Sequence, residues 1–267
     1  SREIGIPCVV GGVTATGMLA DGQMVTVSCA EGSEGRVYEG RVDFERVDID
    51  PATLPAPRVP LMLNLADPGR AFGLAQLPSA GVGLLRIEFV VSNWIGIHPM
   101  ALIHPERIRD EVVRTQVMAQ AAAATTPAAV FVERLASGVA VIAAAFHPKP
   151  VIVRFSDFKT NEYAGLLGGR DFEPVEANPM IGFRGASRYY DERYREAFAL
   201  ECAAIRLVRE EMGLDNVKLM IPFCRTPQEA DEVLRVMAEN GLERGRDGLQ
   251  VYVMCEIPSN VILAEEF

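Results

Sequence analysis

The chain has 267 residues, of which 49% are hydrophobic, enough for one large domain with a sizeable core or for one domain and part of another. Its formal net charge of −10 argues against non-specific nucleic-acid binding, although a local arginine cluster can still bind an anionic substrate. No apolar run is expected to approach the roughly 20 residues that span a bilayer, so we expect no membrane partner. The five cysteines show no CxxC spacing, which favours a reduced cytoplasmic protein over a disulfide framework or a zinc site.

Residues 1–45 are predicted to form a small β-rich piece. The segments "PCVVGG" and "QMVTVSC" are typical of strands, and "EGSEGRVYEG" predicts a further turn and strand. So short a piece cannot bury a generous core alone. Residues 46–59 contain several prolines and are predicted to be an interdomain linker. Because the first three residues resemble mid-protein sequence rather than a signal peptide, we expect the natural polypeptide to be longer.

From residue 60 onward the pattern changes to strands that alternate with helices. Apolar, β-branched segments predict strands at 60–68, 81–90, 151–155, 217–223 and 249–260. Between them, helical periodicity predicts helices at 104–124, 126–146, 191–212 and 226–241. Repeated strand–helix units indicate a parallel sheet of an α/β fold, either an incomplete eight-stranded (β/α)8 TIM barrel with about five strands present or an open doubly wound sheet. No GxGxxG follows a strand, so the fingerprint of a dinucleotide site is missing.

Several helix ends carry recognisable caps. Thr126 and Thr226 are predicted N-caps, each followed by proline at the first helical position, and Glu229 is predicted to complete a capping box. In the helix predicted over 191–212, four apolar residues recur three or four positions apart and predict its buried face: Tyr194, Phe198, Cys202 and Ile205.

Charged residues follow the apolar part of three predicted strands. Arg86 and Glu88 end the second strand, Arg154 and Asp157 end the third, and Glu256 ends the fifth. In a barrel these carboxyl ends converge on one bowl, where the chemistry of such enzymes takes place. Arginine forks bind carboxylate and phosphate, and a carboxylate suits Mg²⁺, so the pattern predicts a site for a small phosphorylated carboxylic acid. The alternative is that each arginine is a solvated or salt-bridged surface group.

The cysteines and histidines are less informative. Cys224 and Cys255 lie near strand ends and are expected to be buried, unreactive thiols. His98, His104 and His147 lie beside prolines and are expected to be structural or exposed.

At the strand ends the sequence resembles a known family. "GVGLLRIEF", "VIVRFSDFKTNEY", "NPMIGFRG" and "MCEIPSN" together resemble the phosphoenolpyruvate-utilising enzymes. "SNWIGIHPMALI" and "RFSDFKTNEYAGLLGG" resemble the branch that makes phosphoenolpyruvate from pyruvate. "REIGIPCVVGG" and "LADGQMVTVSCAEGSEGRVY" resemble the end of the family's swivelling phosphohistidine domain. The resemblance therefore implies that 1–45 ends that domain, 46–59 links it, and 60–267 is a truncated barrel that binds phosphoenolpyruvate and pyruvate.

The resemblance also implies an activity and its residues. In the family, ATP phosphorylates a histidine of the swivelling domain, which passes the phosphoryl group to pyruvate; with water, the products are phosphoenolpyruvate, AMP and phosphate, as in gluconeogenesis. Arg86, Arg154 and Arg184 match the family's substrate arginines, and Glu256 matches a Mg²⁺ ligand, so Mg²⁺ is the implied cofactor. The phosphohistidine and the acid cysteine match no residue of this stretch, and a homodimer is the expected assembly.

Two alternatives remain open. The chain could come from a related phosphotransferase, such as pyruvate phosphate dikinase or enzyme I of the sugar phosphotransferase system. It could also be a non-catalytic fragment, whose unpaired strand edges and apolar surface would favour association.

We predict that these 267 residues alone do not convert pyruvate to phosphoenolpyruvate, because none of the three histidines lies in the family's phosphohistidine motif. A coupled assay of AMP release tests this, and turnover above that of a heat-inactivated sample would contradict it.

Overall fold

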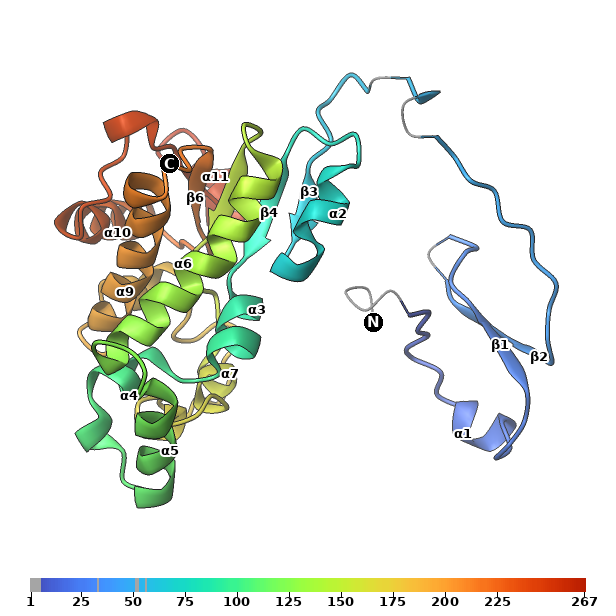
Figure 1. Cartoon of the computed structure of the whole chain (residues 1–267), viewed down its shortest axis with the longest axis horizontal. Coiled ribbons are helices and arrows are strands. Elements are labelled where there is room, and N and C mark those ends of the chain that lie inside the picture. Colours follow the sequence, from blue (N-terminus) through green and yellow to red (C-terminus); the bar gives the residue numbers. More distant parts are fainter. Residues whose placement is uncertain (1–5, 33, 51–52, 56) are drawn as a thin grey trace. The chain divides into compact units, whose positions relative to one another are not determined.

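The computed structural model describes residues 6–32, 34–50, 53–55 and 57–267, and the chain divides into two compact units, Ser1–Leu54 and Pro55–Phe267 (Figure 1). Parts of the predicted N-terminal domain and linker lie outside the described residues: 1–5, Ser33, Pro51, Ala52 and Ala56. The predicted domain boundaries therefore stay predictions.

The described residues of the first unit include a short helix and an antiparallel strand pair. Helix α1 covers Ala15–Met18, and strands β1 (Val25–Ser28) and β2 (Arg36–Glu39) pair with each other. The strand predicted from "PCVVGG" is wrong, because residues 7–12 form no regular element and Gly11 has a φ of +79°, outside the strand region. No described residue of this unit is buried, as expected for a piece too small to hold a core.

The second unit is built on a five-stranded parallel sheet. Its strands are β3 (Leu63–Leu65), β4 (Val82–Arg86), β5 (Val151–Arg154), β6 (Val217–Ile221) and β7 (Val251–Val253), and they lie side by side in chain order. The five predicted strands are confirmed, with shorter bounds. A doubly wound sheet reverses its strand order at a switch point, and this sheet does not, which weighs against that alternative.

The sheet has one covered and one open face. In β5, Val151 and Val153 are buried while Ile152 and Arg154 are only half-buried, and β6 repeats this alternation. Helix α6 (Pro127–Phe146) packs against β5 and against α9 (Arg195–Arg206) (Figure 1). The arginine at the end of β5 therefore belongs to the face with the more exposed side chains.

The remaining helices and single turns connect these elements. They are η2 (Pro68–Arg70), α2 (Ala71–Ala75), α3 (Glu88–Val90), the π-turn η3 (Val91–Ile95), α4 (Pro99–Ile103), η4 (Pro105–Arg107), α5 (Glu111–Ala121), α7 (Thr160–Ala164), η5 (Gly169–Asp171), α8 (Ala186–Tyr189), the π-turn η6 (Leu207–Glu211), α10 (Pro227–Glu239), η7 (Arg246–Gly248) and α11 (Pro258–Ile262).

Both predicted threonine caps are confirmed. Thr126 Oγ1 accepts the backbone N–H of Ala129 at 3.2 Å, and Thr226 Oγ1 accepts that of Glu229 at 3.1 Å. The capping box predicted at Glu229 does not form. Its carboxylate instead accepts the backbone N–H of Arg225, one residue before the cap, at 2.6 Å.

Two predicted helices are interrupted by polar side chains that bond the backbone. The helix predicted over 104–124 begins as η4 and starts again as α5, where Asp110 accepts the N–H of Val112. The helix predicted over 191–212 begins only at Arg195, because Asp191 accepts the N–H of Arg193 in a local turn, and it ends in η6. Its predicted apolar face is buried, as expected: Tyr194, Phe198, Cys202 and Ile205.

Helix α6 corrects the expectation that no apolar run approaches 20 residues. It is 20 residues long and apolar enough to span a membrane by length and composition. Half of that stretch is buried inside the unit, however, and the core helix of a globular domain has the same composition. The helix packs closely against α3 (Glu88–Val90), since a Cβ on Gly138 would lie 2.7 Å from Val90 Cγ1.

We predict that Gly138→Ala destabilises this unit. Alanine would add about 1 kcal/mol of helix propensity, but overpacking against Val90 costs on the order of 1–3 kcal/mol and outweighs that gain. The matched control is Ser137→Ala on the exposed side of the same helix, which should be neutral or slightly stabilising. Urea unfolding midpoints measure both, and equal midpoints would contradict the packing described.

Candidate active site

The carboxyl ends of three strands bring the predicted residues to one edge of the sheet. Arg86 ends β4, Arg154 ends β5, and the two are direct neighbours in the strand register. Residues paired in this way point to the same face of a sheet, so both side chains rise from the open face. Glu256 follows β7, and Arg184 lies in the loop before α8.

Two carboxylates hold Arg154. Its Nη2 donates to Glu88 Oε1 at 2.7 Å, and its Nη1 lies 3.4 Å from Asp157 Oδ2. Glu88 Oε1 also accepts the backbone N–H of Asp157 at 2.8 Å, which closes a triangle. Burial lowers the pKa of Arg154, but the charges of Glu88 and Asp157 outweigh it and raise the pKa above its ordinary value. Arg154 therefore stays charged.

Arg184 shares Asp157 with Arg154. Its Nε and Nη2 donate to the two Asp157 oxygens at 3.0 and 2.7 Å, and its guanidinium lies over the ring of Phe223. Burial lowers the pKa of Arg184, but the hydrogen bonds to Asp157 and the charges of Asp157 and Glu256 outweigh this effect. The pKa of Arg184 is therefore raised above its ordinary value. The Asp157 side chain is only 3% exposed, so its ion pairs with the two arginines are largely shielded from solvent.

Arg86 has spare hydrogen-bond donors. Its side chain is exposed, and no residue in the described part of the chain bonds to it or pairs with it. Arg154 Nε and Glu88 Oε2 are buried and also lack a partner among the described residues. A buried polar atom without a partner costs about 1–3 kcal/mol. The exposed Arg86 is therefore the arginine at this edge whose donors an anionic ligand can reach directly.

The carboxylate of Glu256 is suited to act as one ligand of a magnesium ion. Its side chain is exposed, Oε1 accepts the backbone N–H of Phe223 at 2.7 Å, and no described residue bonds Oε2. The described residues contain no group of three or more His, Cys, Asp or Glu side chains that could hold a metal ion. Mg²⁺ commonly takes only one or two protein carboxylates and completes its shell with water and substrate oxygens. Glu256 alone therefore suits that role, while a full protein cage is not built from these residues.

A buried ion pair supports the loop before α8. Arg188 is fully buried; its Nη1 donates to Glu173 Oε1 at 2.8 Å, and its Nε donates to the carbonyl of Phe183 at 3.1 Å. His98 donates from Nε2 to the same carboxylate at 3.0 Å, because its Nδ1 accepts a backbone N–H. Burial lowers the pKa of His98, so its ring is neutral.

The outcomes for the cysteines and histidines are mixed. Cys224 is buried as predicted, and burial raises the pKa of its thiol to about 12, so it is unreactive. Cys255 is exposed, so that prediction is wrong; it follows the short edge strand β7, which leaves it uncovered. His98 is structural, and His104 and His147 are partly exposed, as expected.

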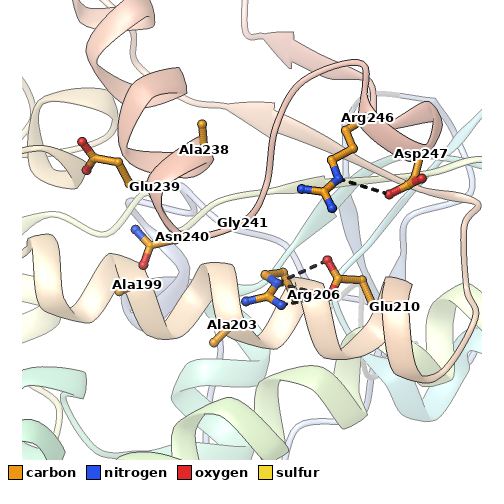
Figure 2. A pocket seen from close by; sticks show the side chains of 10 residues that line it. All are labelled: Ala199, Ala203, Arg206, Glu210, Ala238, Glu239, Asn240, Gly241, Arg246 and Asp247. Carbon is orange, nitrogen blue, oxygen red and sulfur yellow. Dashed lines mark hydrogen bonds and ion pairs between the residues drawn. The ribbon is translucent and has the colours of Figure 1, made fainter.

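A surface pocket lies elsewhere, between α9, η6 and the segment from the end of α10 to η7 (Figure 2). Its arginines are paired with carboxylates, Arg206 with Glu210 at 3.0 Å and Arg246 with Asp247 at 3.7 Å. Because the α10–η7 segment leads into the start of β7, the pocket belongs to the opposite edge of the sheet from the strand tips. It contains none of the predicted site residues.

Two charged residues were visible in the sequence but received no role. Glu88 follows Arg86 by two positions, and Asp157 follows Arg154 by three. The structure uses both as partners of arginines that come from other segments. A carboxylate two or three positions after each strand-end arginine is the signal that could have found them.

Comparison with known proteins identifies the family of the chain. Residues 45–267 match the family described as PEP-utilising enzyme, PEP-binding domain. The chain belongs to the phosphoenolpyruvate-utilising enzyme family.

The chain is similar to several phosphoenolpyruvate synthases. The chain is 52% identical to that of Synechocystis sp., 54% to that of Deinococcus radiodurans and 48% to that of Escherichia coli, in each case over the whole chain. These matches cover 33%, 34% and 34% of the relatives, so the chain spans about a third of their length. It is thus a phosphoenolpyruvate synthase homologue in its PEP-binding part.

We predict that Asp157→Asn destabilises the protein by about 3 kcal/mol, because it leaves two mostly buried guanidinium groups without their shared counter-charge. The control is Glu232→Gln, which breaks the exposed Arg235 pair and should leave the stability almost unchanged. Chemical denaturation measures both variants. Equal losses would contradict a supporting role for Asp157.

Proposed function

We propose that this chain is the phosphoenolpyruvate- and pyruvate-binding part of an enzyme that converts ATP, pyruvate and water to AMP, phosphoenolpyruvate and phosphate. The observation that carries the proposal is the gathering of arginines at one sheet edge. Arg86 and Arg154 are register neighbours, and Arg154 and Arg184 share one buried carboxylate. Guanidinium forks bind carboxylate and phosphoryl oxygens bidentately, and phosphoenolpyruvate carries both groups.

The sheet is proposed to be part of a (β/α)8 barrel. Its sequential strand order and its one covered face support this, because a barrel keeps helices outside and turns the other face inward. The strand tips then lie at the end of the barrel where such enzymes place their sites. The half-exposed residues of the open face, such as Met220, would face the barrel interior.

The arginines have separate tasks in this proposal. Arg154 and Arg184 are held in place by Glu88 and Asp157, so their positive charge is preorganised and needs no rearrangement during the reaction. Arg86 offers its unpaired donors to the phosphoryl or carboxylate oxygens of the bound acid. Glu256 would give one carboxylate oxygen to Mg²⁺, which when bound supplies positive charge beside the substrate's enolate oxygen.

The whole protein is proposed to follow the family plan. Residues 1–45 would end a swivelling phosphohistidine domain, 46–59 would link it, and 60–267 would begin the barrel. ATP would be used by parts of the protein other than this stretch. We propose that the protein acts in the cytoplasm, in gluconeogenesis, and as a homodimer.

We predict that Arg86→Ala in the full-length protein lowers kcat/KM for pyruvate on the order of a hundredfold, the loss typical for one preorganised charge donor. Arg235→Ala, on the exposed face of α10, is the matched control and should leave turnover unchanged. Coupled AMP release measures both. If Arg86→Ala kept activity close to that of the control, the proposed function would be wrong.

A further inference from the structure

Ser156 lies between the two charged residues at the tip of β5 and is bonded at three of its atoms. Its backbone N–H donates to Glu201 Oε2 at 3.1 Å, and its carbonyl accepts from Tyr189 Oη at 2.7 Å. Its Oγ donates to Glu201 Oε1 and accepts from Tyr163 Oη. The backbone N–H, the carbonyl and the hydroxyl of Ser156 are therefore all held by side chains of α7, α8 and α9. Arg154 and Asp157 lie on either side of Ser156 in the sequence.

Four oxygens behind this tip form a closed cycle. Ser156 Oγ contacts Glu201 Oε1, Glu201 Oε1 lies 3.0 Å from Tyr194 Oη, Tyr194 Oη contacts Tyr163 Oη, and Tyr163 Oη lies 2.9 Å from Ser156 Oγ. All four residues are buried. Each contact needs one proton between its two oxygens to be a hydrogen bond.

The number of protons depends on Glu201. With Glu201 ionised, the three hydroxyl groups supply only three protons for the four contacts. One pair of oxygens then has no proton between them, and these two oxygens repel each other. With Glu201 protonated, its own proton goes to Tyr194, that of Tyr194 to Tyr163, that of Tyr163 to Ser156, and that of Ser156 back to Glu201 Oε1. The neutral acid therefore completes the cycle.

From this arrangement we propose that Glu201 is a positioning residue which, in its protonated form, closes the four-oxygen cycle and thereby fixes the β5 tip that carries Arg154 and Asp157. This inference rests on the proposed function of that site. Glu201 does not touch the site's edge itself and acts through Ser156.

The surroundings of Glu201 favour its neutral form. It is fully buried, and its hydrogen-bond partners are an amide and hydroxyl groups rather than a cation. Burial raises the pKa of Glu201 to about 7, even though those hydrogen bonds oppose the shift. The other charged or titratable groups around it are Glu88, Asp157, Tyr163, Arg188, Tyr189, Tyr194 and Cys202.

The neighbouring tyrosines and Cys202 do not titrate in the same range. Burial raises the pKa values of Tyr163, Tyr189, Tyr194 and Cys202 well above their ordinary values, so these groups stay neutral. Arg154 and Arg188 both have raised pKa values and stay charged. As pH rises through about 7, loss of the Glu201 proton is therefore the event expected to open the cycle.

The test uses the full-length protein that carries this sequence and compares Glu201→Gln, Glu201→Ala and Glu196→Gln. Glutamine keeps the shape and the neutral charge, so kcat/KM for pyruvate at pH 6 should stay within a few-fold of the unmodified protein, without the fall that the unmodified protein shows as pH rises past 7. Alanine removes the support and should lower kcat on the order of tenfold to a hundredfold, as misplacement of site groups does. Glu196 lies on the exposed side of the same helix, and its variant should match the unmodified protein.

A second readout does not depend on turnover. The infrared carbonyl-stretch band of a protonated carboxylic acid should be present at pH 6, weaken as pH rises past 7 and be missing in Glu201→Gln. Absence of that band, retention of the pH-dependent fall in Glu201→Gln, or an alanine variant that behaves like Glu196→Gln would each overturn the inference. If Arg86→Ala also left activity intact, the proposed function itself would be wrong. If Arg86→Ala lowered activity while the Glu201 variants behaved like the unmodified protein, only the inference about Glu201 would be wrong.

Discussion

Asp157 is the carboxylate on which the candidate site depends, because it holds two guanidinium groups together where a parallel sheet ends. Two like charges a few ångströms apart in a poorly hydrated place repel each other strongly. Asp157 offsets that repulsion with a bidentate pair to Arg184 and a longer contact to Arg154, while Glu88 holds the other side of Arg154. The arginines can therefore stay charged and in place before any ligand arrives.

The same arrangement explains how an acidic chain can offer an anion site. The formal net charge is −10, yet three arginines gather at this edge, and the exposed Arg86 has no partner among the described residues, so it is available to an anion. Behind the edge, polar contacts made by Arg188, Glu173 and Ser156 tie the charged loops to helices. The core thus fixes both the loop before α8 and the tip of β5.

Much of the fold could be predicted from local patterns, whereas the support of the site could not. The five strands and both threonine caps follow from residues close in sequence. Glu201 and Ser156 are 45 residues apart, and no local pattern in either segment predicts their contact. The strand predicted from "PCVVGG" failed because a β-branched pair next to glycines does not form a strand without a pairing partner. The strand-end arginines were found because charge at the end of an apolar run is itself a local signal.

The central claim is that Arg86, Arg154 and Arg184 bind one small phosphorylated acid at the tips of the sheet. The most direct test is a crystal structure of the full-length protein with phosphoenolpyruvate and Mg²⁺. We expect the ligand's phosphoryl and carboxylate oxygens to bond these three guanidinium groups, with Glu256 on the metal. A ligand bound at the opposite edge of the sheet, or arginines turned away from it into solvent, would show that these arginines do not form the binding site.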